Sequence, residues 1–204
     1  TVLAGTRGRV AEVKNKRVRD LALRHEKPFI ALMEAGAARV QETYGATAAG
    51  LGYRFADHYR MSGRVPQVGA ALGPCFGGPS FTAAQSDFVP IVKDTGFIGM
   101  SGAPVVKVGI GLDVDNEEIG GSEMAAVETG QAGYLAETEA DCMTAIRRFL
   151  SYLPSNCNEA PPRAAPRPAP VSAPHWMRSP EKSNSPAPFL SQPRRSLDAR
   201  ARRV

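Results

Sequence analysis

The stretch QVGAALGPCFGGPS at residues 67–80 decides the fold. Its first part, residues 67–72, is mostly apolar and follows Pro66, as expected for a buried strand. Gly77 and Gly78 then allow a tight turn in which the backbone can approach a ligand. Pro79 suits the first turn of a helix, where a missing N–H costs nothing. The stretch therefore predicts a strand, a glycine turn and a short helix over residues 81–86.

The same alternation of strands and helices continues on both sides of this stretch and places the body among the α/β folds. Residues 29–33 form a continuous apolar run, which predicts a strand covered on both faces. Residues 1–3 read as the end of a strand, so we expect an N-terminally incomplete fragment. Further strands are predicted at 88–92, 96–100 and 125–128. Helices are predicted at 10–25, 43–62, 104–108, 115–119 and 136–153.

The first predicted helix, residues 10–25, combines apolar and basic residues. Helical spacing puts Val10, Val13, Arg17 or Val18, Leu21 and Ala22 on one stripe. Lys14, Lys16, Arg19 and Arg24 surround that stripe, and we expect them to form a solvated basic face.

The tail differs in composition from the body. All 20 glycines lie at or before Gly133, whereas Pro, Ala, Arg and Ser dominate residues 159–204. The tail also carries nine of the 25 Lys and Arg residues but three of the 20 Asp and Glu residues, so the body is close to neutral. Such a segment buries too little apolar surface to offset its ordering entropy. We expect a domain at 1–158 and a disordered basic tail at 159–204, and we do not expect the body to bind nucleic acid.

Composition also indicates the cellular compartment of the protein and whether it binds a metal. Cys75, Cys142 and Cys157 are the three cysteines, and no His/Cys spacing suits zinc, so we expect a reducing, cytoplasmic location and no metal. The uncharged stretch 65–86 contains prolines and glycines throughout, which excludes a membrane helix there. No signal peptide pattern opens the sequence.

Two turns are candidate ligand sites. Amides at Gly77 and Gly78, before a helix, can hold negative charge, although the same turn can exist with no ligand. The second turn, Gly36-Ala37-Ala38-Arg39, follows the apolar run 29–33 and leaves room for a ligand at the end of a strand. Arg39 can pair with a phosphate or carboxylate, or with Glu42 one turn on.

Seven short motifs occur in an order that resembles the carboxyltransferase (β) subunits of biotin-dependent acyl-CoA carboxylases, such as acetyl- and propionyl-CoA carboxylase. The resemblance spans roughly residues 2–158 and identifies this region as part of that family's N-terminal domain. The motifs are GAARVQE at 36–42, GRVPQ at 63–67, GPCFGG at 73–78, DF at 87–88, GAPVVK at 102–107, EEIGG at 117–121 and LSYLP at 150–154.

This resemblance implies an incomplete crotonase-like fold of repeated ββα units. It implies that Gly77 and Gly78 form an oxyanion hole for the enolate of an acyl-CoA thioester, and that Gly36, Ala37, Ala38 and Arg39 lie beside the acyl-CoA. The carboxyl donor would be carboxybiotin on a partner carrier protein. Because the biotin nitrogen takes the α-proton in this chemistry, the family needs no protein acid or base.

Two positions and one domain depart from the family pattern. Ala37 stands where the family has glycine, and its methyl group narrows the approach of a thioester. Ala125 stands where the family has histidine. The family's second, biotin-binding domain does not occur in these residues, so we expect this chain alone to be inactive.

The resemblance further implies a biotin carboxyl carrier or biotin carboxylase subunit as partner, and a homo-oligomer. Two alternatives remain open. One is a related biotin-dependent decarboxylase or transcarboxylase subunit, which uses the same half-site. The other is a non-catalytic interaction protein that acts through its Pro/Arg tail.

Overall fold

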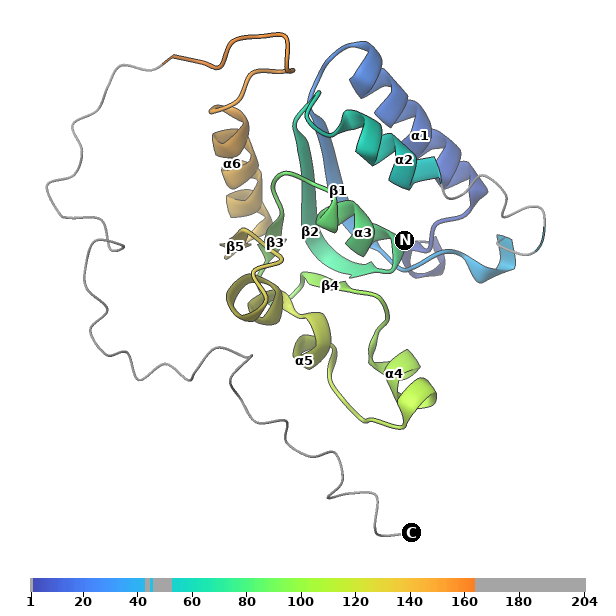
Figure 1. The fold of residues 1–204 in the computed structure, drawn as a ribbon. Coiled ribbons are helices and arrows are strands. Elements are labelled where there is room, and N and C mark those ends of the chain that lie inside the picture. The colour runs from blue at the N-terminus through green and yellow to red at the C-terminus, as the bar shows by residue number, and fades with distance from the viewer. Residues whose placement is uncertain (1, 43–44, 46–52, 164–204) are drawn as a thin grey trace, which may run out of the picture. The chain divides into compact units, whose positions relative to one another are not determined.

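The computed structural model describes residues 2–42, 45 and 53–163, which form a mixed α/β body around a five-stranded sheet (Figure 1). From residue 164 onward the predicted disordered tail lies outside the described residues. Within the described part, no helix combines the length and the apolar character needed to cross a membrane.

The helices and strands alternate along the chain as the sequence predicts. The α-helices are α1 Arg9–Arg24, α2 Tyr53–Met61, α3 Gly78–Ala84, α4 Ala103–Ile110, α5 Asn116–Gly120 and α6 Glu139–Leu150. The strands are β1 Phe29–Ala35, β2 Gln67–Phe76, β3 Pro90–Val92, β4 Phe97–Gly99 and β5 Tyr134–Ala136. Two short 3-10 helices, η1 Val2–Gly5 and η2 Val40–Glu42, and a π-helix, η4 Met124–Glu128, complete the described elements.

The sheet is parallel throughout and is organised by β2. The strand order is β1-β2-β3-β5, and β4 pairs with the last part of β2. Thus Ala71 lies opposite Ile91 of β3, whereas Cys75 lies opposite Ile98 of β4. The long strand β2 therefore pairs with two short strands, β3 and β4, at different points along its length.

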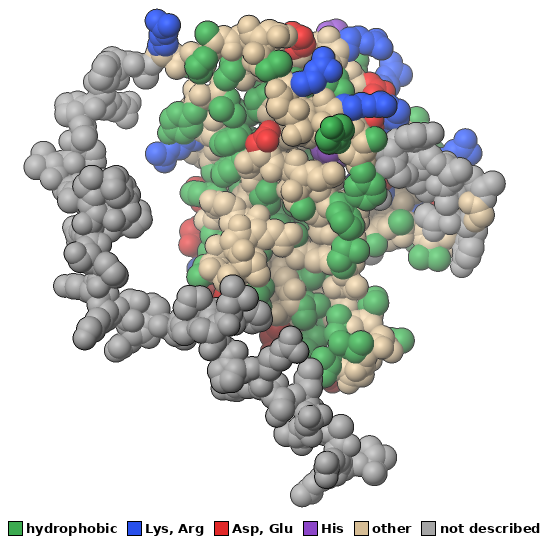
Figure 2. All heavy atoms as spheres, in the orientation of Figure 1, with side chains coloured by type: hydrophobic (Ala, Val, Ile, Leu, Met, Phe, Trp, Pro, Cys, Tyr) green, Lys and Arg blue, Asp and Glu red, His purple; other side chains and the backbone are tan. Residues whose placement is uncertain are grey.

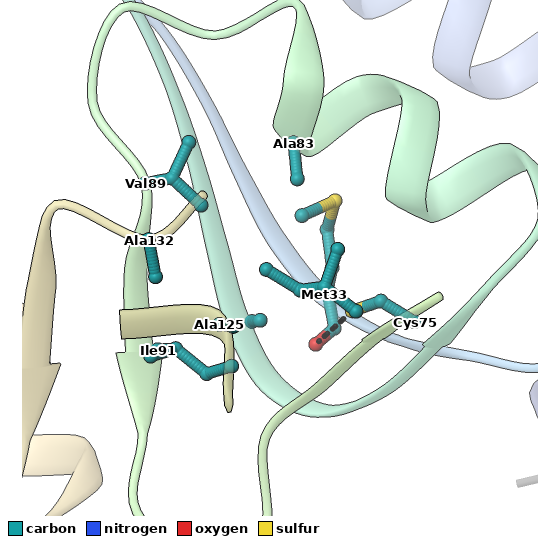
Figure 3. Close-up of a cluster of buried hydrophobic side chains, with 9 residues drawn as sticks. Met33, Cys75, Ala83, Val89, Ile91, Ala125 and Ala132 are labelled. Atoms are coloured by element: carbon teal, nitrogen blue, oxygen red, sulfur yellow. Dashed lines mark hydrogen bonds between the residues drawn. The ribbon is translucent and has the colours of Figure 1, made fainter. Parts of the chain in front are cut away.

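Both faces of β2, which the sequence predicts as a buried strand, are covered. On one face Val68 and Ala70 pack against Cys142 and Ile146 of α6. On the other face Ala71 and Cys75 belong to a second cluster with Met33, Ala83, Val89, Ile91, Ile98, Ala125 and Ala132 (Figure 3). Burial raises the pKa of the Cys75 thiol to about 12, so this thiol is neutral at physiological pH.

Small residues let α3 lie close to β2. A Cβ added at Gly69 would lie 3.1 Å from the Cα of Ala83 and 2.7 Å from the Oγ of Ser86. Any larger residue at Gly69 would push α3 away from the sheet. Since α3 begins directly after the turn at Gly77, this close packing positions that turn.

Several predicted boundaries are wrong for identifiable reasons. Strand β2 continues to Phe76 rather than ending at residue 72, because a bulge opposite Met33–Ala35 accommodates Pro74, which cannot donate to a ladder. Residues 125–128 lie in the π-helix η4 rather than a strand, because alanine favours helices and the buried Ala125 packs in the core from this helix. Strand β5 has no counterpart among the predictions.

In the N-terminal half, the structure differs from two further predictions. Residues 2–5 form the 3-10 helix η1 rather than the end of a strand. The helix predicted at 43–62 is present as α2, and residues 43–44 and 46–52 of that prediction lie outside the described residues.

Strand β1 is covered on one face rather than two. Phe29 and Met33 are buried, but Ile30 and Leu32 are 44% and 54% exposed. The reason is that β1 is the edge strand next to β2, and α6 packs on β2, β3 and β5 instead.

Helix α1 packs on the body through charged residues. Glu12 and Arg19 are buried, and the Arg19 Nε lies 3.1 Å from the Asp57 Oδ2 of α2. The Arg7 Nε lies 3.3 Å from the Glu12 Oε1 on the same side of the helix. Arg19, expected on a solvated basic face, is therefore buried because Asp57 neutralises it.

We predict that Asp57→Ala lowers the free energy of unfolding by about 3–5 kcal/mol, because it leaves the buried Arg19 guanidinium without its carboxylate. The double variant Arg19→Met/Asp57→Ala should regain much of this loss, since neither buried charge remains. Urea denaturation of both variants measures the difference. Asp20→Ala, at an exposed pair with Lys16, is the control and should cost less than about 1 kcal/mol. A double variant less stable than Asp57→Ala would contradict the assignment.

Candidate functional site

The two glycine- and alanine-containing turns predicted from the sequence meet in the structure. Gly36 to Ala38 follow β1, and Gly77 and Gly78 follow β2. Because β1 and β2 are adjacent and parallel, their carboxyl ends lie at the same edge of the sheet. A Cβ built on Gly77 would lie 3.5 Å from the Cβ of Ala37, which is van der Waals contact. Residues 40 positions apart in the sequence therefore form one site.

The second turn depends on the conformation of Gly77. Its φ of 60° and ψ of −110° lie in a region that side chains rarely adopt. The Gly77 N–H donates to the Gly99 carbonyl at 2.9 Å, and the Gly77 carbonyl accepts from the Ser80 hydroxyl at 2.6 Å. Gly78 follows as the first residue of α3, and its N–H has no acceptor among the residues that the structure describes.

The first turn is held by the segment that precedes α1. The Arg7 N–H donates to the Ala37 carbonyl at 3.1 Å, and the Arg39 N–H donates to the Arg7 carbonyl at 2.9 Å. These two bonds fix the Ala37 carbonyl toward residue 7. Within the described ranges, the Ala37 N–H, like that of Gly78, has no acceptor.

Arg39, which the sequence allows to pair either with a ligand or with Glu42, pairs with Glu42 in the structure. Its Nη1 lies 2.8 Å from the Glu42 Oε1, and its Nη2 donates to the Thr6 carbonyl at 3.0 Å. The Arg39 hydrogen bond, followed by that of the Arg9 N–H at the start of α1, holds the pKa of Glu42 below its ordinary value. The guanidinium thus ties the first turn to η2 and to the segment before α1.

A cavity of about 350 Å³ runs beside β1. Ala35, next to the first turn, and Pro79, next to the second, both line it, together with Arg7, Glu34 and Thr82. The two turns therefore adjoin one end of a cavity rather than a flat surface.

Other residues at the site escape sequence reasoning because they act through backbone atoms. Gly99 accepts the Gly77 N–H, and the Met100 carbonyl would lie 3.7 Å from a Cβ on Gly77. A carbonyl group carries no residue-type signal, so no motif marks these positions. Ala125, where the resemblance implies a histidine, is 1% exposed and packs in the core shown in Figure 3. No cluster of three or more His, Cys, Asp or Glu side chains suited to a metal occurs among the described residues.

Comparisons with known proteins identify the family of the chain. The Carboxyl transferase domain model matches residues 1–191. Methylmalonyl-CoA decarboxylase subunit alpha of Veillonella parvula is 36% identical over 162 residues, which cover 79% of this chain and 32% of that protein. The propionyl-CoA carboxylase carboxyltransferase subunit of Haloferax mediterranei is 37% identical over 166 residues, covering 81% and 32%.

Solved structures give the same result. The transcarboxylase 12S structure with hydrolysed methylmalonyl-CoA bound superposes with a TM-score of 0.73 at 30% identity, over 79% of this chain and 32% of that one. The β subunit of Pseudomonas aeruginosa geranyl-CoA carboxylase gives a TM-score of 0.66 at 30% identity, over 75% and 29%.

These matches confirm the crotonase-like α/β fold, and the chain spans about a third of the length of the relatives it matches. Since the family model covers residues 1–191 and the fold superposes on solved members, the chain belongs to the carboxyl transferase domain family.

Proposed function

We propose that this chain provides the acyl-CoA half of a biotin-dependent carboxyltransferase, with the turns at Gly36–Arg39 and Gly77–Gly78 as its binding site. The observation that carries the proposal is the position of the Ala37 methyl group, 3.5 Å from where a Cβ on Gly77 would lie, at the shared carboxyl edge of β1 and β2. Family membership supports the proposed class of chemistry, and the proximity of the two turns supports the proposed location of the binding site.

The proposed role of the site is to hold the thioester oxygen of the acyl-CoA. The N–H groups of Ala37 and Gly78 have no acceptor among the described residues, whereas the Gly77 N–H is bonded to Gly99. We therefore assign hydrogen-bond donation to Gly78 and the first turn. Gly77 contributes the backbone conformation that presents Gly78. Donors fixed before the reaction stabilise an oxyanion without reorganisation, and one such donor contributes about 2.7–4 kcal/mol.

In this proposal the rest of the site keeps the two turns in place. Arg39 acts as a positioning residue, because its guanidinium is engaged by Glu42 and Thr6. Gly36 and Ala38 flank the thioester. Carboxybiotin, carried by a separate biotin carrier protein, supplies the carboxyl group that joins the α-carbon of the acyl group. The residues of this chain then contribute stabilisation of the enolate form of the thioester.

The relatives suggest the class of substrate and the assembly. Those compared above are named for propionyl-, methylmalonyl- and geranyl-CoA, and we propose a short acyl-CoA for this chain because Ala37 narrows the site. Carboxylation and decarboxylation use the same half-site and run in opposite directions. We also propose a biotin carboxyl carrier or biotin carboxylase subunit as partner, assembly into a homo-oligomer, and a reducing, cytoplasmic compartment.

Gly78→Val should weaken binding of propionyl-CoA about tenfold, because the added side chain stands where the thioester oxygen approaches the Gly78 N–H. Calorimetry with propionyl-CoA and with its thioether analogue propyl-CoA, which lacks the carbonyl, separates this effect from loss of CoA contacts. The wild-type chain should prefer the thioester, and the variant should bind both equally. Gly109→Val, at an open helical glycine, is the matched control and should bind like wild type. Equal thioester preference in Gly78→Val and wild type would refute the assignment.

Ala37→Gly should widen the site, because the Ala37 methyl group occupies the space against Gly77. We expect the affinity for butyryl-CoA to rise about threefold to tenfold relative to that for propionyl-CoA, in keeping with the free energy of one methylene in a pocket. The ratio of the two dissociation constants is the measurement. An unchanged ratio would place the acyl group elsewhere.

Binding and transfer should be separable in this chain. Carboxyl transfer requires carboxybiotin to be held within bonding distance of the acyl α-carbon. Without that positioning, the effective concentration of carboxybiotin at the α-carbon is lost. The 204-residue chain, incubated with carboxylated biotin carrier and propionyl-CoA, should therefore form no methylmalonyl-CoA above background. Mass analysis of the CoA esters measures this. Product above background would show that these residues position both substrates.

A further inference from the structure

The peptide unit between Gly77 and Gly78 is only weakly restricted by its own two residues. Glycine has no Cβ, so the residues on both sides of this peptide bond can adopt backbone angles that a side chain excludes. The unit can therefore turn over as a whole, which reverses the directions of its carbonyl and its N–H. The two glycines that let the backbone approach a ligand thus leave the orientation of this unit to other contacts.

The carbonyl and the N–H of this unit are coupled by the geometry of the peptide bond. The bond is trans and planar, so the Gly77 carbonyl and the Gly78 N–H point in opposite directions. Any contact that fixes the carbonyl therefore fixes the N–H as well. In the function proposed above, the Gly78 N–H donates to the thioester oxygen. The direction of the Gly77 carbonyl then controls whether that donor is available to the substrate.

The Ser80 hydroxyl holds the Gly77 carbonyl. It donates to this carbonyl at 2.6 Å, whereas the N–H of Phe81 donates to the same oxygen at 3.2 Å. A carbonyl oxygen has two lone pairs and accepts both bonds. Ser80 is 6% exposed, so water competes little for its hydroxyl. Its other contact, the Met100 Sδ, is at 4.0 Å, and the hydroxyl proton is therefore directed at the carbonyl.

A different contact fixes the preceding peptide unit. The Gly77 N–H donates to the Gly99 carbonyl of β4 at 2.9 Å, which orients the unit between Phe76 and Gly77. Rotation about the next backbone bond, between the Cα and the carbonyl carbon of Gly77, remains possible without breaking this contact. The orientation of the following unit therefore depends on Ser80 and Phe81.

The segments that meet at this turn carry no charge of their own. Residues 36–38, 67–86 and 96–106 contain no Asp, Glu, Lys or Arg. In Figure 2, Lys and Arg side chains gather at the upper right, where Figure 1 places α1. The centre of the same view, where Figure 1 labels α3, shows mainly apolar and uncharged groups. Hydrogen bonds rather than charges of these segments therefore direct the peptide unit.

We propose that Ser80 is a positioning residue for the reaction, whose hydroxyl holds the Gly77–Gly78 peptide unit with the Gly78 N–H directed at the thioester oxygen. The inference rests on the proposed function and adds to it the side chain that orients the donor. Ser80 acts through Gly78 and touches no reacting atom. The hydrogen bond to the carbonyl also polarises the peptide unit, which makes its N–H a stronger donor.

Calorimetry of the full chain with propionyl-CoA and with propyl-CoA tests this role, because the ratio of the two dissociation constants reports on the thioester oxygen. Ser80→Ala should lower the preference for the thioester about threefold to tenfold, the effect of losing one hydrogen bond. Ser80→Thr keeps the hydroxyl and should keep the preference, whereas Ser80→Val has the same shape without the hydroxyl and should lose it. A purely structural role would lower the melting temperature without changing the ratio.

Ser86→Ala is the matched control. It removes a hydroxyl that donates to the Thr82 carbonyl at 2.8 Å, the same kind of bond at the other end of α3. This variant should keep the wild-type ratio of the two dissociation constants.

The orientation of the peptide unit can also be measured without a ligand. In the isotope-labelled chain, ¹⁵N relaxation dispersion at the Gly78 amide detects a unit that turns over in microseconds to milliseconds. Ser80→Ala and Ser80→Val should show this exchange or a shifted Gly78 signal, whereas the wild type, Ser80→Thr and Ser86→Ala should show neither.

The two measurements separate failure of the inference from failure of the proposed function. If the wild type prefers the thioester and the Ser80→Ala and Ser80→Val ratios equal the wild-type ratio, the inference is overturned and the proposed function stands. A wild type that binds both CoA compounds equally refutes the proposed function. The Gly78 signal then still tests the holding role, and an unshifted signal without exchange in Ser80→Ala overturns it.

Discussion

Burial of β2 on both faces is the constraint on which the rest of this structure depends. Its small residues allow α3 to approach within contact distance at Gly69, while Val68 and Ala70 bury α6 on the other side. Because the strand is long, it pairs with β3 at Ala71 and with β4 at Cys75. One segment thus positions two short strands and two helices, and the turn at Gly77 follows directly after its last residue, Phe76.

The candidate site follows from that geometry. Parallel pairing of β1 and β2 brings their carboxyl ends together, and the positive φ of Gly77 turns the chain into α3 against Ala37. The two glycines differ in their backbone hydrogen bonds. The Gly77 N–H donates to the Gly99 carbonyl, whereas the Gly78 N–H has no acceptor among the described residues. In the function that we propose, main-chain donors hold the thioester oxygen, and this role needs no acidic or basic side chain.

Helix α1 shows how charge can override amphipathic patterning. Burying Arg19 against Asp57 and Glu12 against Arg7 costs desolvation, which each ion pair offsets. The same ion pairs that attach α1 to the body thereby leave Val10, Val13 and Leu21 exposed to solvent.

The sequence by itself determined the α/β class, the strand before the Gly77–Gly78 turn, the two candidate turns and the family, because periodicity and ordered short motifs are local signals. Only the tertiary structure decided that Ala37 meets Gly77, that Arg39 is engaged by Glu42, and that Ile30 and Leu32 stay exposed on an edge strand. It also decided that residues 125–128 are helical and that α1 buries its charged side. These features depend on contacts between residues distant in the sequence, or on ion pairs and backbone hydrogen bonds whose partners leave no periodic pattern in the chain.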